Sequence, residues 1–132
     1  MILSAIIFEI ELDYDHNAHD AEYLKQTHFA LYEMVRKKNS ETPIIMMTMP
    51  TTERRENRPW HKPRRDEIIK SFERANALGD ENVYLVDCYG CFGALENGEC
   101  GTVDGIHPDS LGFLRMAERV YPVLDRLLNG EN

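Results

Sequence analysis

Two short apolar runs, at positions 43–49 and 83–86, constrain the fold of this chain more than any other feature. They are too short for helices and lack the polar alternation of a strand with one wet face, which is typical of strands buried on both faces. An apolar run rich in β-branched residues at positions 2–12 predicts a further strand. Helical spacing of apolar residues recurs at positions 20–38, 63–78 and 110–128. This alternation predicts a parallel sheet with helices packed on its faces.

Residues at the helix ends agree with this interpretation. Pro63 suits the first turn of the second helix, and Gly79 is typical of a helix stop. Asp109 or Ser110 is expected to cap the last helix. Pro122 lies inside that helix, where it should bend it or remove one hydrogen bond.

The size and charge of the chain limit its domain count and its partners. With 132 residues, it is expected to form a single domain over positions 1–132. Its 15 basic and 23 acidic residues give a net charge of −8, which argues against nucleic acid or an anionic membrane as partner. No apolar run approaches the roughly 20 residues of a membrane helix, and the N-terminus lacks signal-peptide features. As written, the chain is expected in the cytoplasm, whereas a longer parent protein is left open as secreted or periplasmic.

The chain has three cysteines, and Cys88 and Cys91 form a C-x-x-C pair with Cys100 further on. An odd number in a domain of this size is most simply interpreted as free thiols. A redox pair and a zinc site remain open as alternatives, although no fourth zinc ligand stands at metal spacing. We therefore predict no metal and no cofactor.

The candidate catalytic residues lie after predicted strands, because sites in parallel sheets form beyond the carboxyl ends of the strands. Asp104 stands three residues before His107 in the loop that precedes the last helix. Such a carboxylate can orient an imidazole that takes a proton from a nucleophile. Pro108 blocks helix formation at His107 and so keeps the imidazole on a loop. The alternative is a histidine at a helix start beside an exposed aspartate.

Other candidate residues lie in two further loops. Asn17 follows the first predicted strand and can offer its amide to a developing oxyanion, although asparagine is also a common turn residue. Trp60 and His61 lie in the polar stretch 51–62, which is predicted to be a loop. An ordinary polar loop is the preferred interpretation, and a loop that overhangs the site and contacts substrate through these two residues is the alternative.

Four segments together resemble one known family. The stretch D-G-I-H-P-D-S-L-G-F-L-R-M-A-E at positions 104–118 is similar to the last conserved block of the SGNH (GDSL-type) hydrolases. D-Y-D-H-N-A at 13–18 resembles the block that supplies their oxyanion asparagine, and the apolar runs at 43–49 and 83–86 fit the strands between. The resemblance corresponds to about the C-terminal two-thirds of such a domain. It implies a flavodoxin-like α/β three-layer sandwich, truncated to about three parallel strands with their helices.

The resemblance also implies roles for three residues. His107 would be the general base, Asp104 its orienting carboxylate and Asn17 an oxyanion donor, in an ester hydrolase that acts on a small-molecule or carbohydrate ester without a cofactor. The family's nucleophilic serine lies in a G-D-S motif, which does not occur in this sequence. The chain alone is therefore expected to be nearly inactive as an esterase.

The alternative is a non-catalytic remnant of the family that folds as an oligomer. The strand Ile2 to Leu12 would lack the neighbour that carries the serine, so its edge would be open. A homodimer that pairs this strand with its copy is the predicted remedy.

Overall fold

The computed structural model describes residues 6–9, 20–51, 59–93, 101–105 and 107–130, and of residues 6–9 the backbone alone. The elements of this part of the chain are β1 (Ile6–Glu9), α1 (Ala21–Lys38), β2 (Ile44–Met47), α3 (His61–Ala77), β3 (Val83–Val86) and α4 (Ser110–Asn129). Strands and helices alternate in the predicted order.

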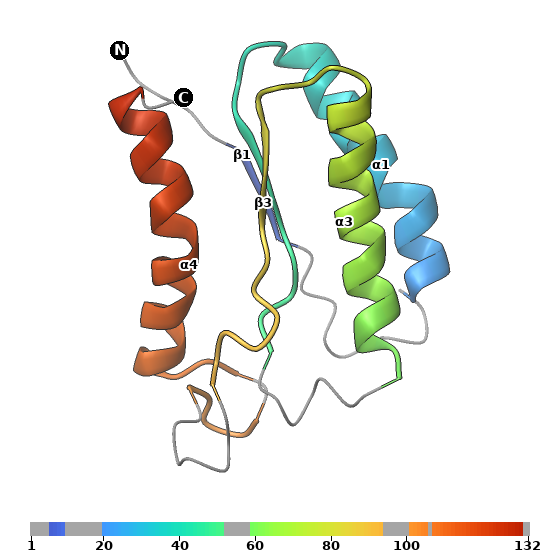
Figure 1. Ribbon diagram of the computed structural model, residues 1–132. Coiled ribbons are helices and arrows are strands. Elements are labelled where there is room, and N and C mark those ends of the chain that lie inside the picture. The colour runs from blue at the N-terminus through green and yellow to red at the C-terminus, as the bar shows by residue number, and fades with distance from the viewer. Residues whose placement is uncertain (1–5, 10–19, 52–58, 94–100, 106, 131–132) are drawn as a thin grey trace.

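The strands of the described residues form one parallel sheet in the order β1-β2-β3. Ile44 of β2 pairs with Ile6 of β1 and with Val83 of β3, so β2 is central and β1 lies at an edge of the described sheet. Helices α1 and α3 cover one face of the sheet and α4 covers the other (Figure 1). This confirms the predicted three-layer α/β arrangement.

β2 carries both hydrophobic cores, because its side chains alternate between the two faces. All of its residues are at most 3% exposed, as expected for a strand covered on both sides. The core on the side of α1 and α3 contains Phe29, Tyr32, Ile44, Met46, Ile68, Ala75 and Val83. The core on the side of α4 contains Ile45, Met47, Val86, Cys88, Cys91, Phe92 and Val123.

An ion pair between Arg36 and Asp80 closes the edge of the sheet where the strands begin. Arg36 Nε lies 2.8 Å from Asp80 Oδ2, which also accepts a hydrogen bond of 2.5 Å from the Tyr32 hydroxyl. The same guanidinium donates to the carbonyls of Thr42, 2.6 Å away, and Asn82, 3.1 Å away. One side chain thus joins the end of α1 to the segments that enter β2 and β3.

The helix ends match the predictions with one difference, at the start of α3. Asp109 caps α4, and Gly130 ends it with a φ of 69°. α3 begins at His61, two residues before Pro63, because Pro63 fits the first turn and a helix can start ahead of it. α4 continues past Pro122 to Asn129, so the proline does not end the helix.

No helix in the described part of the chain is long and apolar enough to cross a membrane.

We predict that His28 makes the fold sensitive to acid. This α1 residue is 1% exposed, and neither ring nitrogen has a hydrogen-bond partner among the described residues. Burial lowers its pKa from 6.5 to about 4, because the imidazolium cannot be hydrated inside the core. Because the pKa of His28 is lower in the folded chain, protonation favours the unfolded chain. The fold is therefore most stable above the unfolded pKa, where His28 is neutral in both states. This contribution, about 3 kcal/mol, should be lost as the pH falls from about 6.5 towards about 4.

Urea unfolding between pH 7 and pH 4 tests this prediction. His28→Leu should remove most of the loss of unfolding free energy over this range. His28→Gln is the matched control, since it keeps a polar group at the position but cannot titrate there. It should also flatten the pH dependence, though from a lower stability at pH 7. Both variants retaining the wild-type slope would contradict the assignment to His28.

Candidate active site

Hydrogen bonds at the carboxyl ends of β2 and β3 hold the loops that follow them together. Thr48 donates from Oγ1 to Asp87 Oδ1 over 2.8 Å and accepts from the Cys88 amide over 2.9 Å. The Thr51 amide donates to the Cys88 carbonyl, and the Phe92 amide donates to the Thr51 carbonyl over 3.1 Å. The two loops are therefore joined into one hydrogen-bonded layer at this edge of the sheet.

The loop that carries His107 is attached to these two loops through Gly101. The Gly101 amide donates to the Phe92 carbonyl, and the Asp109 amide donates to the Gly101 carbonyl, both over 3.0 Å. Within the loop, the Val103 amide donates to the His107 carbonyl over 2.9 Å. His107 is therefore placed at the carboxyl edge of the sheet by backbone bonds.

Asp104 and His107 form the pair that the sequence predicts. His107 Nδ1 lies 2.6 Å from Asp104 Oδ2, and the His107 amide donates to Asp104 Oδ1 over 2.8 Å. Gly105 between them has a φ of 84°, which favours glycine and turns the chain back on itself. With Nδ1 directed at a carboxylate, Nε2 becomes the nitrogen that can accept a proton. The side chains of His107 and Asp104 are 70% and 50% exposed.

Two glycines allow this loop to lie directly against α4. A Cβ atom on Gly112 would stand 2.0 Å from the Gly101 carbonyl oxygen, and one on Gly101 would stand 2.8 Å from the Gly112 Cα. The Asp109 carboxylate caps the helix at the same place, accepting from the amides of Leu111 and Gly112. The first turn of α4 and the loop thus form one packed unit.

A second ion pair at this edge, between Arg65 and Asp87, was missed in the sequence analysis. Arg65 Nε lies 3.0 Å from Asp87 Oδ1, and Arg65 Nη2 also contacts Oδ2. Burial opposes the ionisation of Asp87, but hydrogen bonds from Arg65 and Thr48 outweigh it and hold its pKa below the ordinary value. The Arg65 guanidinium also lies 4.8 Å from the ring centroid of Tyr89. A helix, two strand ends and a loop are joined by these contacts, so local sequence patterns could not reveal them.

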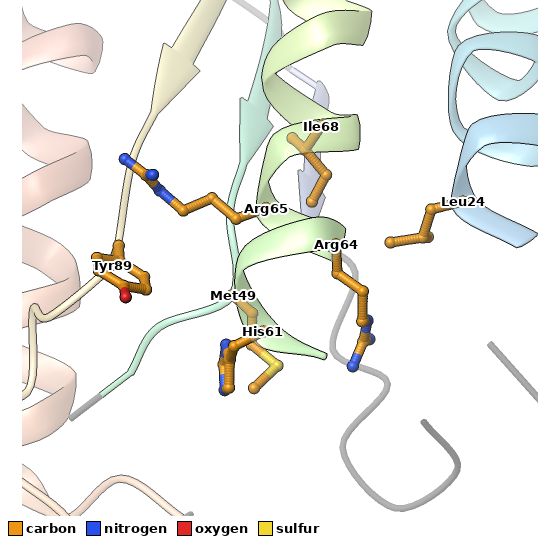
Figure 2. Close-up of a pocket in the computed structure, with 7 residues that line it drawn as sticks. All are labelled: Leu24, Met49, His61, Arg64, Arg65, Ile68 and Tyr89. Atoms are coloured by element: carbon orange, nitrogen blue, oxygen red, sulfur yellow. The ribbon is translucent and has the colours of Figure 1, made fainter. Parts of the chain in front are cut away.

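Around the N-terminal turns of α3, seven residues line a pocket, and Figure 2 shows them. They are Leu24, Met49, His61, Arg64, Arg65, Ile68 and Tyr89.

The sequence interpretation placed Trp60 and His61 in a loop, which is wrong for His61, whereas Trp60 lies in the turn just before α3. His61 is the first residue of α3 and only 3% exposed. Its ring stacks on Trp60 with centroids 4.4 Å apart, and the Arg64 guanidinium lies 5.5 Å from the Trp60 ring. His61 is thus a buried polar residue that a pattern of hydropathy assigns to a loop.

Several predicted features fall outside the described residues. These include Asn17 with its loop, Cys100 and the stretch 52–58. Cys88 and Cys91 are described, and both are buried and not joined in a disulfide.

The sequence profile of the GDSL-like lipase/acylhydrolase family matches residues 5–125. The chain belongs to this family. No curated protein sequence matches it.

Solved structures with a similar fold include hydrolases and a transferase. A Bacteroides ovatus protein described as a GDSL-like lipase is 24% identical with a TM-score of 0.70, and the match covers 83% of this chain and 33% of that one. A carbohydrate esterase family 3 protein from Talaromyces cellulolyticus is 16% identical with a TM-score of 0.69, covering 97% and 60%. The salicylyl-acyltransferase SsfX3 of a tetracycline biosynthetic pathway is 17% identical with a TM-score of 0.66, covering 86% and 35%.

These likenesses confirm the predicted α/β fold of the SGNH hydrolases. The chain spans between 33% and 60% of the length of these solved structures.

We predict that Gly112→Ala disrupts the site, although alanine favours helices. Its methyl group would overlap the Gly101 carbonyl, and because backbone stands on both sides the overlap cannot be relieved by a side-chain movement. We expect a loss of unfolding free energy of about 3 kcal/mol and shifted NMR signals of His107. Ser110→Ala, an exposed change at the start of the same helix, should cost less than about 0.5 kcal/mol. Unchanged His107 signals in Gly112→Ala would show that this contact does not position the loop.

Proposed function

We propose that this chain carries the acid–base part of a serine ester hydrolase. The observation that carries the proposal is the hydrogen bond between Asp104 and His107 on a loop at the carboxyl edge of a parallel sheet. Membership of the GDSL-like lipase/acylhydrolase family supports the reaction class.

In the proposed mechanism, His107 Nε2 removes the proton from a serine hydroxyl as the oxygen attacks the ester carbonyl. Asp104 holds the imidazole in the required tautomer and stabilises the imidazolium that forms. The protonated His107 then donates to the leaving alcohol, and a water molecule repeats the sequence to release the acid. Asn17 is proposed as a hydrogen-bond donor to the tetrahedral oxyanion. The proposed substrates are small-molecule or carbohydrate esters, and the reaction needs no cofactor.

The serine is proposed to come from a G-D-S segment outside the 132 residues. Among the serines that the structure describes, Ser71 is buried in the middle of α3, where it donates to the Glu67 carbonyl over 3.1 Å. Ser40 is an exposed residue between α1 and β2, at the opposite end of the sheet from His107. Ser110 opens α4, with its neighbour Asp109 as the cap. The position of each of these serines is explained by its local structure, and none of them lies in a G-D-S motif.

We predict that the 132-residue chain hydrolyses a short p-nitrophenyl ester without a burst. Its rate should lie within about tenfold of that of its His107→Ala variant, because His107 has no serine to activate. A longer polypeptide that adds an upstream G-D-S segment should turn over. In that polypeptide, His107→Ala should lower kcat roughly 10³-fold or more and Asn17→Ala roughly 10²-fold.

Asp109→Asn is the matched control for Asp104→Asn in the longer polypeptide. Both replace a loop carboxylate by an amide, but Asp109 caps α4, a role that asparagine also fills. Asp104→Asn should lower kcat and Asp109→Asn should not. A large rate from the 132-residue chain that depends on His107 would contradict the proposed external serine.

We also propose that the chain alone forms a homodimer through β1. The described sheet ends at this strand. The strand Ile2 to Leu12 of a second copy of the chain would pair with the outward N–H and C=O groups of β1.

Light scattering at micromolar concentration should then give twice the mass of 15.3 kDa. Hydrogen exchange at the amides of β1 should slow as the concentration rises through the dimerisation range. A stable monomer, or a dimer whose β1 amides show no change, would argue against pairing through this edge.

A further inference from the structure

Cys88 and Cys91 occupy a tight turn directly after β3. The Cys91 amide donates to the Cys88 carbonyl over 3.1 Å, which closes a four-residue turn. Such a turn brings its end Cα atoms within about 7 Å, and disulfides span about 4.4–6.8 Å between Cα atoms. Both side chains belong to the core on the α4 side of the sheet, so they turn to the same side of the backbone. The turn can therefore accept a bond between the two sulfur atoms with little movement.

Other groups around the turn favour a thiolate at Cys91. The Cys88 thiol hydrogen-bonds to the Cys91 sulfur, and the charges of Arg119 and Arg115 and the Thr51 amide act in the same direction. Together they outweigh burial and hold the pKa of the Cys91 thiol below its ordinary value. Cys91 is also the less buried of the two, with 5% of its surface exposed against none for Cys88. In this arrangement Cys91 is the attacking thiol and Cys88 the resolving one.

We propose that Cys88 and Cys91 are a reversible redox site, at which a hydroperoxide converts the two thiols into a disulfide. This site is independent of the proposed ester hydrolysis, since neither sulfur belongs to the Asp104–His107 pair.

The proposed reaction has two steps. The Cys91 thiolate attacks one oxygen of hydrogen peroxide, so that an S–O bond forms, the O–O bond breaks and the departing oxygen leaves as water after protonation. The Cys88 sulfur then loses its proton and attacks the Cys91 sulfur. An S–S bond forms, the S–O bond breaks and a second water leaves. Two thiols are oxidised, one peroxide is reduced to two waters, and a small dithiol reverses the change.

Oxidation at this turn has a structural route to the loop of His107. The next residue, Phe92, donates to the Thr51 carbonyl and accepts from the Gly101 amide. A disulfide would fix the turn from which this chain of hydrogen bonds starts. The site is thus placed where a change in thiol state reaches the base of the 101–109 loop.

The experiment treats the reduced, folded 132-residue chain with hydrogen peroxide at neutral pH and follows its intact mass. A Cys100→Ser background removes the third thiol. We expect a loss of two hydrogens, mapped by peptide mass to a Cys88–Cys91 link and reversed by dithiothreitol. Cys88→Ser should leave a sulfenic acid on Cys91 that dimedone traps. Cys91→Ser should slow the oxidation of the remaining Cys88 at least about tenfold.

Circular dichroism shows whether each variant is folded, and alanine replacements of the same cysteines give a second set of variants. The mass change is measured in the chain that keeps both Cys88 and Cys91, so it requires no substitution at either residue. The proposal is overturned if the native chain keeps both thiols and loses hydrogens only in urea, as inert core cysteines would. It is also overturned if Cys88 and Cys91 react at equal rates, or if the oxidised product is a disulfide between two chains.

Discussion

The burial of β2 on both faces is the constraint on which the rest of the structure depends. A strand of four residues contributes few hydrogen bonds, so its position is fixed by apolar side chains that leave water on both sides of the sheet. Ile44 and Met46 face one core while Ile45 and Met47 face the other. A shift in register by one residue would exchange the two sets. Each core would then contain the side chains that now pack in the other core, and the close packing would be lost. The strand therefore sets where both layers of helices lie.

Both ends of this central strand are closed by charged groups, and the two ends differ in character. Where the strands begin, the Arg36 guanidinium is saturated by a carboxylate and backbone carbonyls, which makes that end a structural clamp. Where the strands end, Thr48 and the Arg65–Asp87 pair join the strand ends to α3, while His107 stands out from the loop beside them. The exposed titratable group thus lies at the end where parallel sheets form their sites.

The sequence predicted the elements well because their signals are local. The apolar runs, the Asp109 cap and the place of Pro63 in a first helical turn each depend on neighbours along the chain, and the structure confirms them. The Asp104–His107 pair could also be predicted from the sequence, because the two residues are only three positions apart and Gly105 between them, with its positive φ, brings their side chains together.

The remaining features depend on tertiary contacts that one sequence does not show. Gly101 and Gly112 are ordinary loop and helix glycines until the two backbones meet, and only then is the absence of a Cβ needed. His61 looks like a loop residue because the stretch around it is polar, but it is buried at the start of α3, where its ring stacks on Trp60. In the same way, Arg65 gives no sign along the chain that its partner is Asp87, 22 positions away.

The exposure of the Asp104–His107 pair bears on how the proposed chemistry could operate. Electrostatic stabilisation of a transition state is strong only where water is largely excluded, yet these side chains are 70% and 50% exposed among the described residues. A catalytic base in this position needs a further surface over it, in addition to a nucleophile in front of it. Phe113 and Leu114 in the first turns of α4 are also more than half exposed, so apolar area is available near the loop for such a surface to cover. The solved relatives are all longer than this chain, which is consistent with that requirement. If the proposed function holds, one segment that supplies the serine and covers this face would complete the site and exclude water from it at the same time.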